Sequence, residues 1–257
     1  MRTFTNIPVS LCEYALVNRK INQLKLYIYL KLISDGYVVM SNSCNKQWSE
    51  AIGVHEKTVK SSLKWLIRHK WITVNSNRNA LRIISYKNLS RKLGLGLKTG
   101  YLYEVEQVED FKKLKALCCA TVITYYMNRK RFFDKKQSGC IKGRPTTNCK
   151  KKNTFYPMPN NYLARSTNVS TATAYRYKHE AEKSGYIETK SNYSIVETRQ
   201  GDKILLDSYN VILKGILNDE QPNRLKKGKF YLEWEESTLI RSCIKTKKKE
   251  YAVKGKK

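Results

Sequence analysis

One stretch of this chain occurs twice at a constant separation. Residues 48–77 and 163–192 superpose without a gap when the first is shifted by 115 positions (169 minus 54). Identical residues at equivalent positions include Val54 and Val169, Thr58 and Thr173, and Ile72 and Ile187. Gly53 aligns with Asn168, and these two residue types most readily adopt the left-handed conformation that a tight turn between helices needs. Each copy therefore predicts a short helix, a turn, a second helix and a strand.

Apolar periodicity places the first copy within a longer series of elements. Residues 21–35 carry an apolar helical stripe, 37–40 form a short β-prone run, and 45–52 and 56–70 predict two further helices. The segments 71–75 and 80–86, joined by a polar turn, predict a β-hairpin. Helix, strand, helix, helix and hairpin is the order of elements in a winged helix-turn-helix domain.

The second copy predicts the same domain with an insertion. Residues 113–123 parallel residues 23–33 at an offset of 90, so this copy carries about 25 additional residues (115 minus 90), at 134–158. A short helix near 160–166, a helix at 170–184 and a hairpin at 186–199 follow. We therefore expect a mainly α fold with small β-hairpins, built from two winged helix-turn-helix domains in tandem. The expected boundaries are 1–90 for the first domain, 91–108 for a linker, 109–215 for the second domain, and 216–257 for a basic C-terminal extension.

The charge of the chain indicates a polyanionic partner. Fifty Lys and Arg residues against 21 Asp and Glu residues leave a formal net charge of +29. Such an excess is usually offset by a polyanionic partner, for which nucleic acid is the first candidate and an anionic membrane surface the second. The helix-turn-helix pattern favours double-stranded DNA. No apolar stretch is long enough to cross a bilayer, and no secretory signal is evident. Seven cysteines in irregular positions suggest reduced thiols, so we expect a cytoplasmic protein without a membrane partner.

The second helix of each repeat is expected to lie in the major groove of DNA. In the first copy Val59, Leu63, Leu66 and Ile67 are predicted to face the core, and in the second Ala174, Tyr177, Ala181 and His179. The side chains left facing outward are Lys57, Thr58, Lys60, Ser61 and Lys64, and Ser170, Thr171, Thr173, Tyr175, Arg176 and Lys178. Arg176 is predicted to read a guanine, the four lysines to contact phosphates, and Ser170 to cap its helix. The alternative is that these charges form a solvated helix face.

Basic residues outside these helices are further candidates. Arg78 and Arg82 flank the first hairpin turn, and Lys190 and Arg199 the second, where they would reach the DNA backbone or minor groove. In the insertion, the sequence Lys142-Gly143-Arg144-Pro145 resembles the core of an AT-hook, which lays an arginine along a narrow minor groove. A basic loop without that function is the alternative for this segment.

Catalytic and metal-binding patterns are not evident. Cys118, Cys119, Cys140 and Cys149 lack the paired spacing of a zinc site, so we interpret them as incidental thiols. The three histidines form no metal-binding or relaxase pattern, and we predict neither an enzyme nor a cofactor. His55 aligns with the capping Ser170, which indicates a structural role at a helix start.

With two winged helices in tandem, preceded by Gln-Leu-Lys-Leu-Tyr-Ile-Tyr-Leu-Lys-Leu-Ile at 23–33, the chain resembles plasmid and phage replication initiators. The resemblance implies binding to directly repeated origin DNA, association into a homodimer through the first domain, and recruitment of host replication proteins. The insertion and the high charge depart from that family. Alternatives are a transcriptional regulator with the same fold, a nickase or recombinase, a protein that coats DNA without sequence preference, and an RNA-binding protein.

Overall fold

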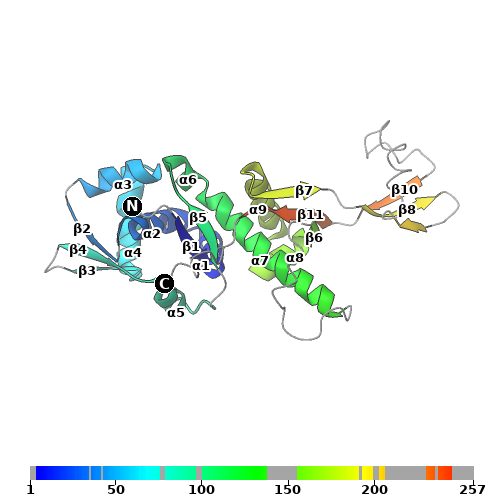
Figure 1. Cartoon of the computed structure of the whole chain (residues 1–257), viewed down its shortest axis with the longest axis horizontal. Helices are drawn as coiled ribbons and strands as arrows, with labels where there is room; N and C mark the ends of the chain where they lie inside the picture. Colours follow the sequence, from blue (N-terminus) through cyan, green and yellow to red (C-terminus); the bar gives the residue numbers. More distant parts are fainter. Residues whose placement is uncertain are drawn as a thin grey trace, which may run out of the picture.

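The computed structural model describes residues 4–34, 36–41, 43–75, 79–96, 100–137, 155–190, 193–198, 203–205, 230–234 and 237–244. Helices and small antiparallel sheets make up a mixed α+β fold (Figure 1). The N-terminal unit runs from β1 to α5. Its elements are β1 (Phe4–Pro8), α1 (Val9–Val17), α2 (Ile21–Ile33), β2 (Tyr37–Val39), α3 (Cys44–Ile52), α4 (Glu56–Arg68), β3 (Ile72–Asn75), β4 (Ala80–Ile83) and α5 (Tyr86–Lys92).

The N-terminal unit contains the predicted series from α2 to the β3–β4 hairpin. The hairpin pairs Ile72 with Ile83 and Asn75 with Ala80, and β2 adds to β4, so the strand order is β2-β4-β3. The fully buried Trp71 ring lies at the end of α4, 5.3 Å from the ring of Tyr27 on α2. This aromatic contact packs α2 against the base of the hairpin. β1, α1 and α5 were not predicted from the sequence.

The C-terminal unit repeats this order with one long interruption. Its elements are β5 (Gly100–Glu104), α6 (Val108–Lys112), α7 (Leu114–Gln137), β6 (Tyr156–Pro159), α8 (Asn160–Thr167), α9 (Thr171–Lys183), β7 (Ile187–Lys190), β8 (Tyr193–Thr198), β9 (Lys203–Leu205), β10 (Phe230–Trp234) and β11 (Ser237–Ser242). The predicted insertion at 134–158 overlaps the end of α7 and the start of β6, and residues 138–154 lie outside the described part of the chain.

The expected hairpin at 186–199 is wrong. β7 pairs with β11, with Ile187 opposite Ser242 and Lys190 opposite Leu239, and the strand order is β6-β11-β7. β11 therefore takes the central place that β4 holds in the N-terminal unit, and its Ile240 is fully buried. A segment that the sequence analysis assigned to a C-terminal extension completes the sheet of this unit.

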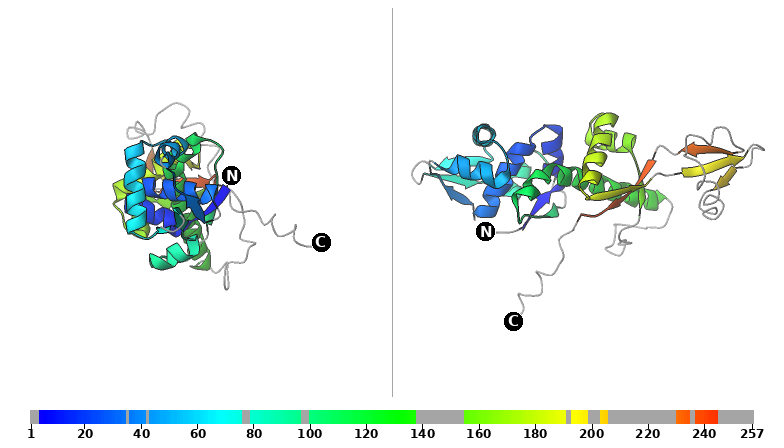
Figure 2. Two further views of the ribbon diagram at one scale, coloured as in Figure 1. Left: turned by 90° about the vertical axis from the view of Figure 1, so that its left-hand side faces the viewer. Right: turned by 90° about the horizontal axis from the view of Figure 1, so that it is seen from above.

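A second three-stranded sheet has the order β10-β8-β9. It lies beyond β7 and β11, away from the rest of the molecule (Figure 1). β8 follows β7 along the chain and pairs with β10, which precedes β11; Thr198 lies opposite Phe230. The pairs β7–β11 and β8–β10 thus form consecutive parts of one antiparallel ribbon (Figures 1 and 2).

The two units share one hydrophobic core. β1 pairs antiparallel with β5, with Phe4 opposite Glu104 and Pro8 opposite Gly100. Residues 91–108, expected to be a linker, contain this buried strand, so the units are held side by side. α1 packs along α7 in this core. There the hydrogen bond with the Cys12 thiol, together with burial, raises the pKa of the Cys118 thiol well above its ordinary value.

Candidate nucleic-acid interface

The turn between the paired helices has the same geometry in both units. α3 ends at Gly53 with φ 64°, and α8 ends at Asn168 with φ 54°. The next amide closes each turn: Val54 donates to the Ser49 carbonyl at 3.1 Å, and Val169 donates to the carbonyl 115 positions after Ser49, that of Ala164, at 3.0 Å. The left-handed conformation predicted at both positions is confirmed.

The second helix of each pair is capped and begins at its predicted place. The Nδ1 atom of His55 accepts a hydrogen bond from the Lys57 amide at 3.1 Å, and the Ser170 hydroxyl accepts one from the Thr173 amide at 3.2 Å. Such a bond satisfies one of the amides that the first turn of a helix leaves without a partner. The capping roles predicted for His55 and Ser170 are confirmed.

α4 and α9 bury the same face. The buried residues of α4 are Val59, Ser62, Leu63 and Leu66, and those of α9 are Ala174, Tyr177, Lys178 and Ala181, each 115 positions later. Because the buried faces coincide, the exposed faces coincide too. Both helices therefore present their opposite faces to solvent in the same register.

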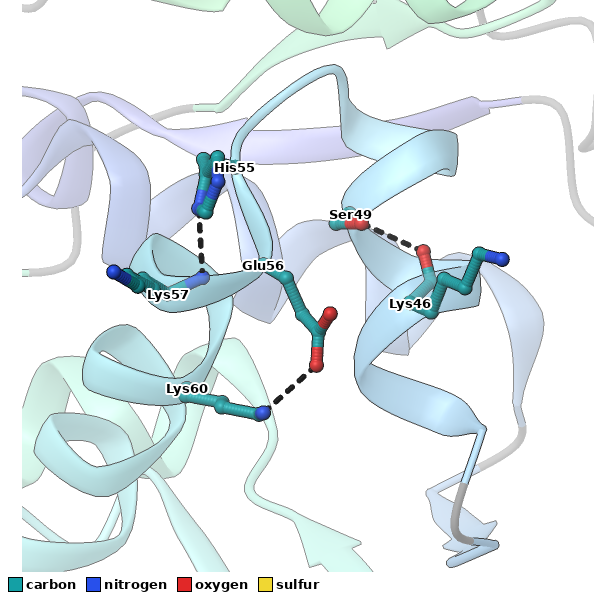
Figure 3. Close-up of polar contacts among 6 residues, drawn as sticks. All are labelled: Lys46, Ser49, His55, Glu56, Lys57 and Lys60. Atoms are coloured by element: carbon teal, nitrogen blue, oxygen red, sulfur yellow. Dashed lines mark hydrogen bonds and ion pairs between the residues drawn. The ribbon is translucent and has the colours of Figure 1, made fainter.

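The exposed face of α4 is basic, and Figure 3 shows two of its lysines, Lys57 and Lys60, near the start of the helix. Lys57, Lys60 and Lys64 are exposed together with Ser61, while Thr58 is half-buried. The Lys60 ammonium lies 2.8 Å from the Glu56 carboxylate, and this hydrogen bond is the main cause of the lowered pKa of Glu56. Both partners are largely exposed, so the pair adds little stability. Within the described residues no ion pair engages Lys57 or Lys64.

The exposed face of α9 carries fewer charges and more hydrogen-bonding groups. Ser170, Thr171 and Arg176 are exposed, Thr173 is half-buried, and the Tyr175 side chain is 60% exposed. The Tyr175 ring is stacked on that of His179 with 6.5 Å between centroids. His179 is exposed, so its predicted inward orientation is wrong; it occupies the place of Lys64 in the N-terminal unit.

Lys178 does not belong to the exposed face on which the sequence analysis placed it. Its side chain is 4% exposed, and its ammonium donates to the Met158 carbonyl of β6. Burial lowers its pKa from 10.5 to about 8. The equivalent residue of the N-terminal unit is the buried Leu63, so Lys178 is a core position whose long side chain reaches a backbone acceptor. We therefore remove it from the predicted DNA-contacting residues.

The predicted wing residues have mixed placements. Arg82 is exposed on β4 between its cross-strand neighbours Tyr37 and Thr73. Lys190 is exposed at the end of β7, and its ammonium lies 4.5 Å from the centroid of the Phe155 ring. Arg78, Lys142, Arg144 and Arg199 lie outside the described residues.

The sequence analysis missed a group of basic residues between the two units. A cleft of about 720 Å³ separates the start of α2 from the exposed face of α9. The basic side chains that line it are Arg19, Lys25, Lys112, Lys115, Arg176 and His179. Only Arg176 was a predicted site residue. Of the others, His179 lies on α9 beside Arg176, and Arg19, Lys25, Lys112 and Lys115 come from the turn before α2, from α2, from α6 and from α7, with no local pattern that links them.

Comparison of the chain with protein-family profiles, curated proteins and solved structures found no significant match. None of the helices in the described part of the chain is long and apolar enough to cross a membrane. Among the described residues no three His, Cys, Asp or Glu side chains gather as metal ligands would, and Cys118 and Cys119 are fully buried in α7.

Proposed function

We propose that the protein is a sequence-specific double-stranded DNA-binding protein with two winged helix-turn-helix units, which acts at a replication origin or operator of a mobile element. The proposal rests on two capped helices, α4 and α9, which we call the readers. They present equivalent exposed faces in a chain of net charge +29. A helix of this kind fits the major groove of B-DNA, and the excess positive charge suits the phosphate backbone.

The two faces suggest a division of labour. Lys57 and Lys64 are cations without a carboxylate partner among the described residues, which suits contacts to phosphates on either side of the groove. Arg176 is exposed on α9 beside hydroxyl-bearing residues, and its guanidinium suits O6 and N7 of guanine. A bidentate contact of this type contributes about 1–3 kcal/mol of discrimination between bases. The C-terminal unit would therefore supply more of the sequence preference.

The assignment to winged helices draws on the strand order as well as the helices. In each unit a three-stranded antiparallel sheet combines one strand that precedes the helix pair with two that follow it, in the orders β2-β4-β3 and β6-β11-β7. The wing of the N-terminal unit is the β3–β4 hairpin. The wing of the C-terminal unit would be the long ribbon of β7, β8, β10 and β11, which is suited to follow the DNA backbone or enter the minor groove.

The test is selection of bound sequences from a random duplex library, followed by binding titrations of selected and random duplexes over a range of salt. We expect a preferred sequence. Arg176→Ala should relax the preference at one base position, whereas Lys64→Ala should weaken all duplexes alike and lower the salt dependence by about one charge. Lys87→Ala, which removes an exposed lysine on α5 outside both faces, is the control.

Three outcomes separate the alternatives. Equal binding to all duplexes at every salt concentration would refute sequence-specific recognition and leave a coating protein. Nicking of supercoiled plasmid in magnesium or manganese would show that the protein is a nucleic-acid enzyme. Mapping of the protected sites in the host and element DNA would distinguish an origin from an operator, because the same fold serves both uses.

A further inference from the structure

The cleft between the units is strongly positive and only partly neutralised. Lys115 is paired with Glu180 at 3.1 Å, and Lys112 with Glu109 at 3.2 Å. No carboxylate among the described residues pairs with the remaining three charges, those of Arg19, Lys25 and Arg176. A cleft with this balance of charge attracts an anion.

Lys25 is the most unusual of these cations. The residue is 8% exposed and lines the cleft, yet it makes no hydrogen bond or ion pair with any described residue. Burial, and then the neighbouring charge of Lys112, lower its pKa. An ammonium on a largely buried side chain without an acidic partner is costly in the unliganded protein, and an anion in the cleft would offset that cost.

The start of α2 adds a second positive feature. This helix of 13 residues has no side-chain cap and no acidic residue in its first turn. Its first two residues, Ile21 and Asn22, line the cleft. The amides of an uncapped first turn, together with the helix dipole, form a binding place for phosphate.

The cleft joins residues of both units. Arg19 lies in the turn before α2, with φ 56°. Burial raises the pKa of Tyr177 on α9, and the positive charge of Arg19 partly offsets that rise. Arg176 and Thr173 enter from the opposite side, on the same face of α9 that would read bases. An anion held here would contact the N-terminal unit while α9 lies on DNA.

We propose that this cleft binds a backbone phosphate of the duplex beside the major groove that α9 enters. Arg19, Lys25 and the amides of α2 hold this phosphate, while Arg176 of the other unit lies across the cleft with its guanidinium left for the base. The inference rests on the proposed function and deepens it, because the shared phosphate would set how the two readers lie on one duplex. The same chemistry would also accept a free polyphosphate, and the experiment separates the two sources.

The test compares Lys25→Met and Arg19→Asn with the control Lys87→Met. Methionine retains the buried stem of Lys25 without its charge, and asparagine tolerates the left-handed backbone at Arg19. Each variant is titrated with selected and random duplexes and, separately, with inorganic tripolyphosphate, and its thermal midpoint is measured without ligand. We expect both variants to bind every duplex about tenfold more weakly, with a salt dependence lower by about one charge.

Stability provides a second, independent readout. Lys25→Met should raise the thermal midpoint of the ligand-free protein while it weakens DNA binding, a combination that a purely structural lysine would not produce. The control should change neither property. The proposal is supported if both effects occur, whether or not tripolyphosphate also binds.

Contrary results identify what has failed. Unchanged duplex binding by both variants overturns the phosphate contact and leaves the two readers intact. Unchanged duplex binding combined with Lys25-dependent binding of tripolyphosphate shows that the cleft serves a free polyphosphate instead. If the wild type binds no duplex at any salt, the proposed function itself fails, and the source of the phosphate assigned here fails with it.

Discussion

Replacement of Lys178 by methionine tests whether this lysine is a buried core residue rather than a contact to DNA. The ammonium of Lys178 is buried, and its pKa is lowered from 10.5 to about 8. The unfolded chain therefore binds more protons than the folded protein between about pH 8 and 10.5, so the free energy of unfolding rises with pH through that window. Below pH 8 the ionised lysine is a cost to the fold, and above pH 10.5 that cost is gone.

The size of the effect follows from the shift. A change from 10.5 to about 8 corresponds to about 3 kcal/mol, of which about 2.5 kcal/mol falls between pH 7 and 10. In Lys178→Met at pH 7, the cost of burying an ionised lysine is removed, but the hydrogen bond to the Met158 carbonyl, worth about 1.5–3 kcal/mol, is lost as well. The two changes nearly cancel. The pH dependence of the difference between wild type and variant is therefore diagnostic, rather than its value at one pH.

The assay is urea unfolding of wild type, Lys178→Met and the control Lys183→Met at several pH values from 7 to 10. Lys183 is exposed on the same helix, so its removal should leave the wild-type curve unchanged. Titrating tyrosines are common to all three proteins and cancel in the differences. A constant difference between wild type and Lys178→Met across this range would refute the burial argument. A lower salt dependence of DNA binding in Lys178→Met would restore the phosphate contact predicted from the sequence.

Three other substitutions test the repeat and its completion by β11. Gly53→Ala should lower the free energy of unfolding, measured in urea, by at least about 1 kcal/mol, because φ at this position is 64° and the added Cβ would lie 3.0 Å from Val108 of α6. Unchanged stability would contradict this contact between the units. Ser170→Ala should lower the free energy of unfolding by about 1 kcal/mol through loss of the helix cap. Ser170→Asp should preserve stability, because aspartate also caps, and weaken DNA binding through its negative charge. Equal DNA binding by Ser170→Asp and wild type would place the start of α9 away from the DNA backbone. Ile240→Ala should cost about 2–5 kcal/mol in thermal or urea unfolding, and a negligible cost would show that β11 is not part of the folded unit.

The local elements followed from short-range patterns. The Gly53 and Asn168 turns, the caps at His55 and Ser170, and the buried faces of α4 and α9 depend on residues within a few positions of one another. Helical periodicity and turn conformation are properties of such short segments, so one sequence with an internal repeat was sufficient to predict them.

The position of Lys178 was predicted wrongly because its place in the helix and its charge point to opposite environments. Lys178 lies four residues after Ala174 and three before Ala181, so periodicity alone would have placed it inward, although it was predicted to face outward. Its charge argued for the surface, because a lysine is rarely buried unless a partner is near. The partner is the Met158 carbonyl, which is 20 residues away in the chain and belongs to another element.

Strand pairing and the inter-unit cleft depended on contacts between distant segments. β8 and β11 are both plausible partners for β7 by composition, and only the packed structure selects β11, with Ile240 buried beneath it. The cleft likewise brings Arg19 and Lys25 to Arg176. Desolvation and charge proximity are properties of the assembled core. A repeated local pattern thus specifies two helix pairs with equivalent exposed faces. The pairing of β1 with β5, the buried Lys178 and the positive cleft between the units arise only when the units pack together.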